Sequence, residues 1–263
     1  MTVTLLLTFD FDAESPWLAP EADDASRDLT QRSWGAYGGR RGIHRIASML
    51  DELELQATFF VPGWTADAYP ERVRELHARG HEIGHHCYQH VPPVTLSADA
   101  QREDFMRGIE AIERCTGERP LGYRSPSWQL TPVTFALLRE HGFAYDSSCM
   151  GDDRPYVERH GELEILELPV HWTLDDWPHL GFLAHHSGPL RDPADVIVTW
   201  RREVEAAIEE QRPLVLTCHP ELIARAGSMR TFAEFVRELR GDPRVRFARC
   251  IDVARAHGGE EAR

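Results

Sequence analysis

The chain has 263 residues, of which 42% are hydrophobic and 27% charged, a composition typical of globular proteins. Its 43 acidic and 29 basic residues give a net charge of −14, which argues against a nucleic-acid partner and an anionic membrane surface, because both need clustered lysine and arginine. No run of residues approaches the about 18 apolar positions that a membrane-spanning helix needs. Because there is no repeat, low-complexity segment or linker, the sequence predicts a single domain over residues 1–263.

The cysteines and the first residues of the chain indicate where the protein works. There are five cysteines, an odd number, and none forms a CxxC pair, so a disulfide framework is not expected. The first ten residues lack the basic region and the cleavage site of a secretory signal. We therefore expect reduced thiols and a cytoplasmic location.

The first half of the chain alternates between strand and helix patterns. Apolar β-rich runs indicate strands, and apolar residues spaced three or four apart indicate helices. In chain order the sequence predicts a buried strand at 3–11, a polar loop over 13–42, a helix at 43–53, a strand at 57–61, a helix at 71–79 and a short strand at 82–83. We expect a loop as long as 13–42 to be functional.

The second half continues the alternation. It predicts a helix at 97–116, a strand at 121–123, a helix at 131–141, a strand at 163–169, a helix at 194–210, a strand at 213–217, a helix at 232–240, a strand at 245–248 and a frayed tail from 258. About seven strand–helix units indicate a parallel sheet, either a barrel or a large open sheet. Several strands end at reactive residues, namely Asp12, His86, Arg124 and His219. In a parallel barrel the carboxyl ends of the strands share one face, which carries the active site.

Asp10 and Asp12 lie two residues apart at the end of the first strand. Alternate side chains of a strand point the same way, so both carboxylates are expected on one side. They repel each other unless a cation or a shared proton lies between them. The alternative is an exposed strand end with solvated acids.

His86 and His90 are spaced four residues apart. This spacing would place both imidazoles on one side of a helical turn, where they could share a metal ion. With Asp12 they would form a two-histidine, one-carboxylate site that leaves positions open for water or substrate. The alternative is a polar loop that happens to be rich in histidine, since the chain has 14 of them. His85 is expected to point elsewhere.

Three further segments carry candidate residues, each with a plainer alternative. Arg124 could hold a carboxylate with its planar fork, or form a surface ion pair. Asp175 and Asp176 could be functional or a solvated acidic turn. His219 follows an apolar strand, where it could be reactive or a core histidine. Candidate pocket walls are Trp128 and Trp177, with Trp17 and Trp34 interpreted slightly more as ordinary packing residues.

In this order, these residues resemble the polysaccharide deacetylase family with the NodB-homology domain. The motifs that carry the resemblance are residues 8–12, 80–90, 124–128, 175–177 and 214–220, within a match over roughly residues 3–250. The family's usual first motif has adjacent aspartates, whereas Phe11 separates them here. That spacing resembles a branch with allantoinase-like, cyclic-imide-hydrolase-like and peptidoglycan-deacetylase-like members.

The resemblance implies a fold, a cofactor and residue roles. The fold is α/β, a distorted (β/α)7 barrel, and the cofactor is a divalent metal, zinc by expectation. The implied metal ligands are Asp12, His86 and His90. Asp10 is implied to be the general base, oriented by Arg124, and His219 the general acid. The acidic residue that supports His219 is Asp175 or Asp176, of which we select Asp176.

We therefore expect a metal-dependent hydrolase of amide bonds other than peptide bonds. The first hypothesis is an N-deacetylase acting on an acetylated sugar or a small acetamide, with a role in carbohydrate metabolism. The second is a ring-opening amidohydrolase of cyclic imides or ureides. The third, a non-catalytic metal- or ligand-binding protein, would lack at least one catalytic position, and none is replaced. Expected partners are a small-molecule or saccharide substrate and, by resemblance, a homotetramer, with neither nucleic acid nor membrane.

Overall fold

The computed structural model describes residues 2–18, 29–183 and 188–261, and all statements on its structure concern these residues. Strand β1 (Val3–Asp10) lies at the centre of a sheet and is buried along its whole length. It pairs in parallel with β2 (Thr58–Val61), β8 (Leu214–Cys218) and β9 (Val245–Ala248). A strand covered on both faces needs a continuous apolar run, and its sequence Val-Thr-Leu-Leu-Leu-Thr-Phe supplies one.

The other strands extend the sheet on one side of β1. Next to β2 come β3 (Glu82–His85), β4 (Gly122–Tyr123), β5 (Tyr145–Asp146) and β7 (Leu163–Glu167), and β6 (Tyr156–His160) pairs with β7 as the antiparallel edge. After β7 the chain returns to β8 through a single parallel bridge between Asp175 and Thr217. The sheet is thus curled, mostly parallel and irregular between β7 and β8, which confirms the distorted barrel.

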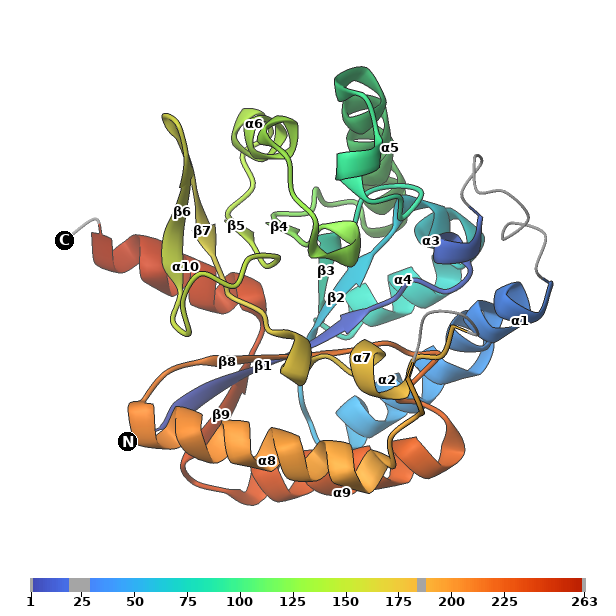
Figure 1. Cartoon of the computed structure of the whole chain (residues 1–263), viewed down its shortest axis with the longest axis vertical. Helices are drawn as coiled ribbons and strands as arrows, with labels where there is room; N and C mark the ends of the chain where they lie inside the picture. The colour runs from blue at the N-terminus through green and yellow to red at the C-terminus, as the bar shows by residue number, and fades with distance from the viewer. Residues whose placement is uncertain (1, 19–28, 184–187, 262–263) are drawn as a thin grey trace.

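Helices cover the outside of the curled sheet (Figure 1). They are α1 (Leu29–Tyr37), α2 (Ile43–Glu52), α3 (Gly63–Ala68), α4 (Pro70–Ala78), α5 (Ala98–Thr116), α6 (Pro132–Glu140), α7 (Trp177–Leu180), α8 (Pro193–Glu210), α9 (Ala226–Gly241) and α10 (Cys250–Glu261). The largest buried cluster lies where these helices meet the strands. In it, Phe9 of β1 stacks on Phe59 of β2 and meets Phe232 of α9 edge-on.

Several predicted helix ends match the structure because their capping residues act locally. The Ser97 hydroxyl accepts a hydrogen bond from the backbone N–H of Ala100, and α5 ends at Gly117 with a positive φ of 77°. Thr131 and Thr134 form a reciprocal capping box at the start of α6, whose first residue is Pro132. Capping residues lie within a few positions of the helix end that they stabilise, so they can be recognised in the sequence.

The predicted loop over 13–42 is wrong for its second half. Residues 29–37 form α1, and a π-helical turn over Gly38–Gly42 joins α1 to α2. The glycines there permit close contact, because a Cβ on Gly35 would lie 2.4 Å from the carbonyl oxygen of Ala13 and one on Gly42 would lie 2.2 Å from that of Pro220. Residues 19–28 of the predicted loop lie outside the described residues.

Helix α10 continues to Glu261, past residue 258 where the sequence predicts the tail to begin. The start of α10 is fixed by side chains of the sheet: Thr58 accepts from the N–H of Cys250 and Glu82 from that of Ile251. The two-residue strand β5, the hairpin strand β6 and the short helix α3 were missed, since none carries a long periodic pattern. Among the described residues, no helix is long and apolar enough to cross a membrane.

Candidate active site

The predicted site residues come together in one pocket of about 410 Å³. It lies at the carboxyl ends of the strands, as the barrel geometry predicts. The residues that line it and were predicted from the sequence are Asp10, Asp12, Trp17, His86, His90, Trp128, Asp175, Trp177 and His219. Arg124 and Asp176 do not line the pocket but contact the residues that do.

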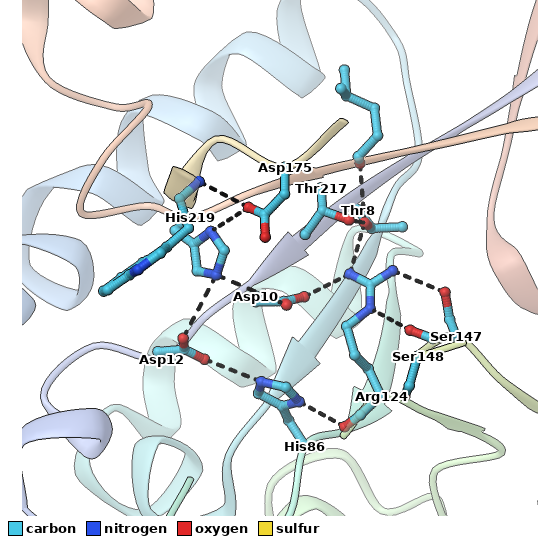
Figure 2. Close-up of polar contacts among 12 residues, drawn as sticks. Thr8, Asp10, Asp12, His86, Arg124, Ser147, Ser148, Asp175, Thr217 and His219 are labelled. Carbon is cyan, nitrogen blue, oxygen red and sulfur yellow. Dashed lines mark hydrogen bonds and ion pairs between the residues drawn. The ribbon is translucent and has the colours of Figure 1, made fainter. Parts of the chain in front are cut away.

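The two aspartates stand at the end of β1. Asp10 is its last residue and Asp12 follows the strand, and the side chains of both are almost completely buried. Phe11, between them, is fully buried, and its ring lies 6.1 Å from that of Tyr69. Figure 2 shows both carboxylates facing the space that His86 and His219 also face. The alternative of solvated acids at an exposed strand end is therefore wrong.

Arg124 is fully buried, so it is not a surface ion pair. Its Nη1 donates to Asp10 Oδ1 at 2.7 Å and to Thr8 Oγ1 at 2.9 Å. Its Nε donates to the carbonyl oxygen of Ser147 and its Nη2 to the hydroxyl of Ser147, both at 2.9 Å (Figure 2). The guanidinium also lies 4.2 Å from the ring centre of Phe60. With its donors engaged, Arg124 fixes one oxygen of Asp10 and leaves the other free.

The two predicted metal-binding histidines lie in a loop and not in the expected helical turn. Cys87 and His90 have positive φ values of 58° and 57°, which a right-handed helix excludes. The loop is held instead by Asp104 of α5, whose carboxylate accepts from the N–H groups of Tyr88 and Gln89. The rings of His86 and His90 are still only 4.9 Å apart. The two rings are therefore close together, as the prediction requires, although the helical turn expected for them is wrong.

His86 and His90 both face Asp12. His86 Nε2 lies 3.5 Å from Asp12 Oδ1, and His90 Nε2 lies 3.2 Å from Asp12 Oδ2. His85, by contrast, turns its Nε2 to the carbonyl oxygen of Phe105 at 2.9 Å, away from this group. Burial of the Asp12 carboxyl raises its pKa, but the neighbouring His90, His86 and His219 outweigh that effect and hold the pKa well below its usual range.

The donor atoms of Asp12, His86 and His90 fit a divalent metal ion. They lie within 4.8 Å of one another. His86 Nδ1 contacts the carbonyl oxygen of Arg124 at 2.7 Å, so Nδ1 carries the proton and the lone pair of Nε2 faces Asp12. Burial lowers the pKa of His86 to about 4, so the ring is neutral near pH 7.

A metal ion would also satisfy the carboxylate. Asp12 Oδ1 is buried and lacks a hydrogen-bond partner among the described residues. It therefore faces the lone pair of His86 Nε2, and two lone pairs in contact repel unless a cation lies between them. Ligands of a tetrahedral zinc ion lie about 3.4 Å apart, close to the separations seen here.

His219 follows β8 and is held by Asp176. The Nδ1–H of His219 donates to Asp176 Oδ1 at 2.7 Å, and the backbone N–H of His219 reaches both oxygens of that carboxylate at 3.0 Å. Asp175 Oδ1 is farther from the same Nδ1, at 3.4 Å. The structure therefore favours Asp176 as the partner of His219 that the sequence alone left open.

The acidic surroundings also decide the charge of His219. Burial lowers the pKa of this imidazole, but the carboxylates of Asp175, Asp176 and Asp12 outweigh burial and raise the pKa well above its usual value. The ring is therefore protonated near neutral pH. Its Nε2 lies 3.9 Å from Asp10 Oδ2 and 3.8 Å from Asp12 Oδ2, at the centre of the site.

Tryptophans form much of the pocket wall. Trp128 and Trp177 line the pocket as expected, and Trp128 stacks on Trp172 with ring centres 4.1 Å apart. Trp17 also lines it, whereas Trp34 stacks on both Trp17 and Trp177 at 5.9 Å and does not line this pocket. The interpretation of Trp34 as a packing residue matches this geometry, and that of Trp17 does not.

Some residues that hold the site were missed in the sequence. Asp104, Ser147, Asp146 and Glu167 lie in segments without a motif, and only the folded chain brings them near the reactive residues. Glu221 follows His219 by two residues, is buried, and has no partner for either carboxylate oxygen among the described residues. Burial, and then the nearby Asp12, raise the pKa of Glu221 well above its usual value.

Comparison with known proteins agrees with the fold. A family model described as polysaccharide deacetylase matches residues 35–145. The peptidoglycan deacetylase of Helicobacter pylori is 28% identical over 273 residues, covering 93% of this chain and 92% of that protein. The Puue allantoinase has the same fold, with a TM-score of 0.82, 22% identity, and coverage of 98% of this chain and 90% of that one.

A solved structure from Mycobacterium smegmatis is more similar in sequence. It is assigned to the polysaccharide deacetylases, is 39% identical, and superposes with a TM-score of 0.92 over 99% of this chain and 91% of its own. With this identity over nearly the whole length, the chain belongs to the polysaccharide deacetylase family and is a hydrolase of carbon–nitrogen bonds other than peptide bonds.

Proposed function

We propose that the protein is a metal-dependent N-deacetylase of an acetylated sugar or a small acetamide. The observation that carries the proposal is one pocket in which Asp10, held by Arg124, and His219, held by Asp176, lie beside the group of Asp12, His86 and His90. Amide hydrolysis needs a base for the attacking water and an acid for the leaving nitrogen. The site offers both, next to a donor set for a metal.

The residues that would hold the metal are Asp12, His86 and His90. When bound, a zinc ion would lower the pKa of a water molecule and stabilise negative charge on the substrate oxygen. Hydrogen bonds within the chain fix both the proton position on a ligand histidine and the position of the ligand loop. The carbonyl oxygen of Arg124 fixes the tautomer of His86, and Asp104 fixes the loop that carries His90.

Asp10 is proposed as the general base. Arg124 binds its Oδ1, so the carboxylate cannot rotate freely and Oδ2 remains to accept a proton from water. The pair is buried, and removal of either partner leaves a buried charge, at a cost of about 3–5 kcal/mol. We therefore assign Arg124 the task of holding Asp10 in position.

His219 is proposed as the general acid. Its raised pKa keeps Nε2 protonated near neutral pH, and Asp176 fixes the ring through Nδ1. The proton on Nε2 would pass to the amide nitrogen as the carbon–nitrogen bond breaks, because an amide anion is a poor leaving group. Asp10 ends β1 and His219 follows the neighbouring strand β8, so the proposed base and acid lie close together, with His219 Nε2 3.9 Å from Asp10 Oδ2.

The second candidate is a ring-opening amidohydrolase of cyclic imides or ureides. The observation that favours it is the small pocket of about 410 Å³ with Trp17, Trp128 and Trp177 in its wall. Aromatic faces on several sides suit a small planar ring as well as a single sugar. The same acid, base and metal ligands would serve either amide bond.

Two further properties are part of the proposal. The described cysteines are all free thiols, which supports a cytoplasmic location. A homotetramer is proposed from the family resemblance. The −14 net charge supports a substrate other than nucleic acid.

A substrate panel tests the proposed function. Purified protein with defined zinc content would be given N-acetylglucosamine oligomers, acetamides, succinimide and allantoin, and release of acetate or ring opening measured. We expect acetate release, abolished in Asp10→Asn. Turnover of succinimide or allantoin alone would select the second candidate, and no turnover of any compound with zinc bound would contradict both.

A further inference from the structure

Two carboxyl side chains lie buried behind Arg124, outside the pocket. Asp146 ends β5 and Glu167 ends β7, and the two residues are direct partners in the parallel ladder. Neither residue has any exposed surface. Two buried carboxyl groups side by side are costly unless their oxygens find donors.

Only half of these oxygens have donors. Glu167 Oε1 accepts from the backbone N–H groups of Ser148 at 2.8 Å and Cys149 at 3.0 Å. Asp146 Oδ1 accepts from the hydroxyl of Ser148 at 2.7 Å. Glu167 Oε2 and Asp146 Oδ2 are buried and have no conventional partner in the described part of the chain. One proton held between these two oxygens would satisfy both and remove the repulsion of two adjacent anions.

The carboxyl pair binds the Ser147–Ser148 segment, and the same segment binds Arg124. Ser147 accepts from Nε and Nη2 of Arg124, at its carbonyl and hydroxyl oxygens, both at 2.9 Å. The Ser148 hydroxyl, which donates to Asp146, accepts from the backbone N–H of Ser125, next to Arg124. The carboxyl pair therefore bonds Ser148, the adjoining Ser147 bonds Arg124, and Arg124 bonds Asp10, so the pair is linked to Asp10 through hydrogen bonds and the peptide bond between the two serines.

We propose that Asp146 and Glu167 share one proton and act as positioning residues, fixing the Ser147–Ser148 segment so that Arg124 holds the base Asp10. The positioning role rests on the proposed function of Arg124 and Asp10, whereas the shared proton does not. Neither residue touches the pocket, so both act through Arg124.

The charges around the pair agree with this assignment. Burial, followed by the facing carboxyl of Asp146, raises the pKa of Glu167 well above its usual value. Burial also raises the pKa of Asp146, against the opposing effect of Arg124. The other titratable neighbours are Tyr123, Cys149 and Tyr156, the last of which faces Glu167 across the β6–β7 ladder; burial is the largest cause that raises their pKa values, and they stay neutral. Arg124 lowers the pKa of Asp146, but its charge is already paired with Asp10, so it cannot balance two further negative charges.

A double-mutant cycle tests the positioning role. Glu167→Met removes the polar end at similar size, Glu167→Gln keeps an acceptor and supplies an N–H in place of the shared proton, and exposed Glu164→Met on the same strand is the control. With N-acetylglucosamine oligomers, we expect Glu167→Met to lower kcat by about 10- to 100-fold at little changed KM. Glu167→Gln should restore most of kcat, and Glu164→Met should leave it unchanged.

The cycle is completed in an Arg124→Lys background. There Glu167→Met should lower kcat little further, because the group through which it acts is already altered. An equal loss in both backgrounds, or a Glu167→Gln variant as slow as Glu167→Met, would overturn the positioning role. If Glu167→Met does not fold, Asp146→Ala takes its place with the same expectations. If Arg124→Lys itself keeps full activity, the proposed function of Arg124 fails, and the positioning role fails with it.

The shared proton is tested without an assay of activity. A carboxyl group with a raised folded-state pKa contributes stability that is complete below its unfolded value, near 4.5, and is lost as pH rises through the raised value. The free energy of unfolding of the parent should therefore fall relative to that of Glu167→Gln as pH rises. Parallel curves would contradict a shared proton. A metal lost with Glu167→Gln would likewise overturn it, because Asp146, Cys149 and Glu167 would then be metal ligands.

Discussion

At the scale of single residues, the site depends on fixing the charge and direction of a few buried groups. Burial lowers the pKa of His86, so His86 is neutral. Burial also lowers the pKa of His219, but the surrounding carboxylates raise it by more, so His219 is charged. Two histidines of one pocket thus differ in protonation state, one suited to bind a metal and the other to give up a proton. The difference comes from their neighbours and not from their position in the sequence.

Asp176 offers a direct test of this balance. Asp176→Asn removes a carboxylate that raises the pKa of His219, so the pKa should fall and His219 should lose its proton at lower pH. The basic limb of the profile of kcat/KM against pH should therefore move to lower pH, with lower activity on the alkaline side. Exposed Asp195→Asn, on α8, serves as the control. A basic limb that stays in place, or moves upward, would show that His219 is not the acid.

At the scale of elements, the sequence was sufficient to predict a helix or strand where the residues of that segment alone determine its structure. The apolar run of β1, the caps of α5 and the strand ends that carry Asp10, Arg124 and His219 could be predicted from their own residues. The helical turn expected for His86 and His90 was wrong, because Asp104 of a distant helix holds that loop open. Contacts between remote segments leave no local pattern to find.

The π-helical turn over Gly38–Gly42 also depends on a contact with a remote segment. The sequence predicts a loop at its glycines. Gly42 packs against the backbone of Pro220, next to His219. Gly42→Ala should therefore destabilise the fold and lower activity together, because a new Cβ would lie 2.2 Å from the Pro220 carbonyl oxygen. Gly227→Ala in helix α9, where nothing lies within 4 Å, should be neutral or stabilising by about 0.5–1 kcal/mol. Thermal unfolding of both variants checks this, and equal stability would contradict the close packing.

At the scale of the whole molecule, the barrel gathers side chains from the ends of the four strands β1, β3, β4 and β8 into one site. The residues span Asp10 to His219, so the site can exist only when the sheet has closed between β7 and β8. The parallel α/β sheet and the candidate reactive residues followed from the repeated strand–helix order and from the chemistry at strand ends, whereas the distorted barrel and the residue roles were implied by the family resemblance. The supporting acids Asp104, Asp146 and Glu167 did not, because their roles arise only from the closed barrel.

Metal binding should stabilise the whole fold, because a ligand that binds only the native state adds to its stability. We expect zinc to raise the Tm of the parent by a few degrees, and a chelator to reverse the effect. A His86→Ala, His90→Ala variant, which lacks two of three ligands, should bind about one ion fewer per chain and show no zinc-dependent shift. His77→Ala, on α4 and away from the site, is the control. An unchanged zinc-dependent shift in the double variant would place the metal elsewhere.

The central claim is that Asp10 and Asp12, at the end of β1, have different tasks although they face the same space. The measurement that tests it most directly is zinc content and turnover, determined together, for Asp10→Asn and Asp12→Asn. Asp10→Asn should keep its zinc and its fold but lose turnover by roughly two to four orders of magnitude, because it removes the base. Asp12→Asn should lose zinc and turnover together. If Asp10→Asn loses the metal while Asp12→Asn keeps it, the roles are reversed and the assignment is wrong.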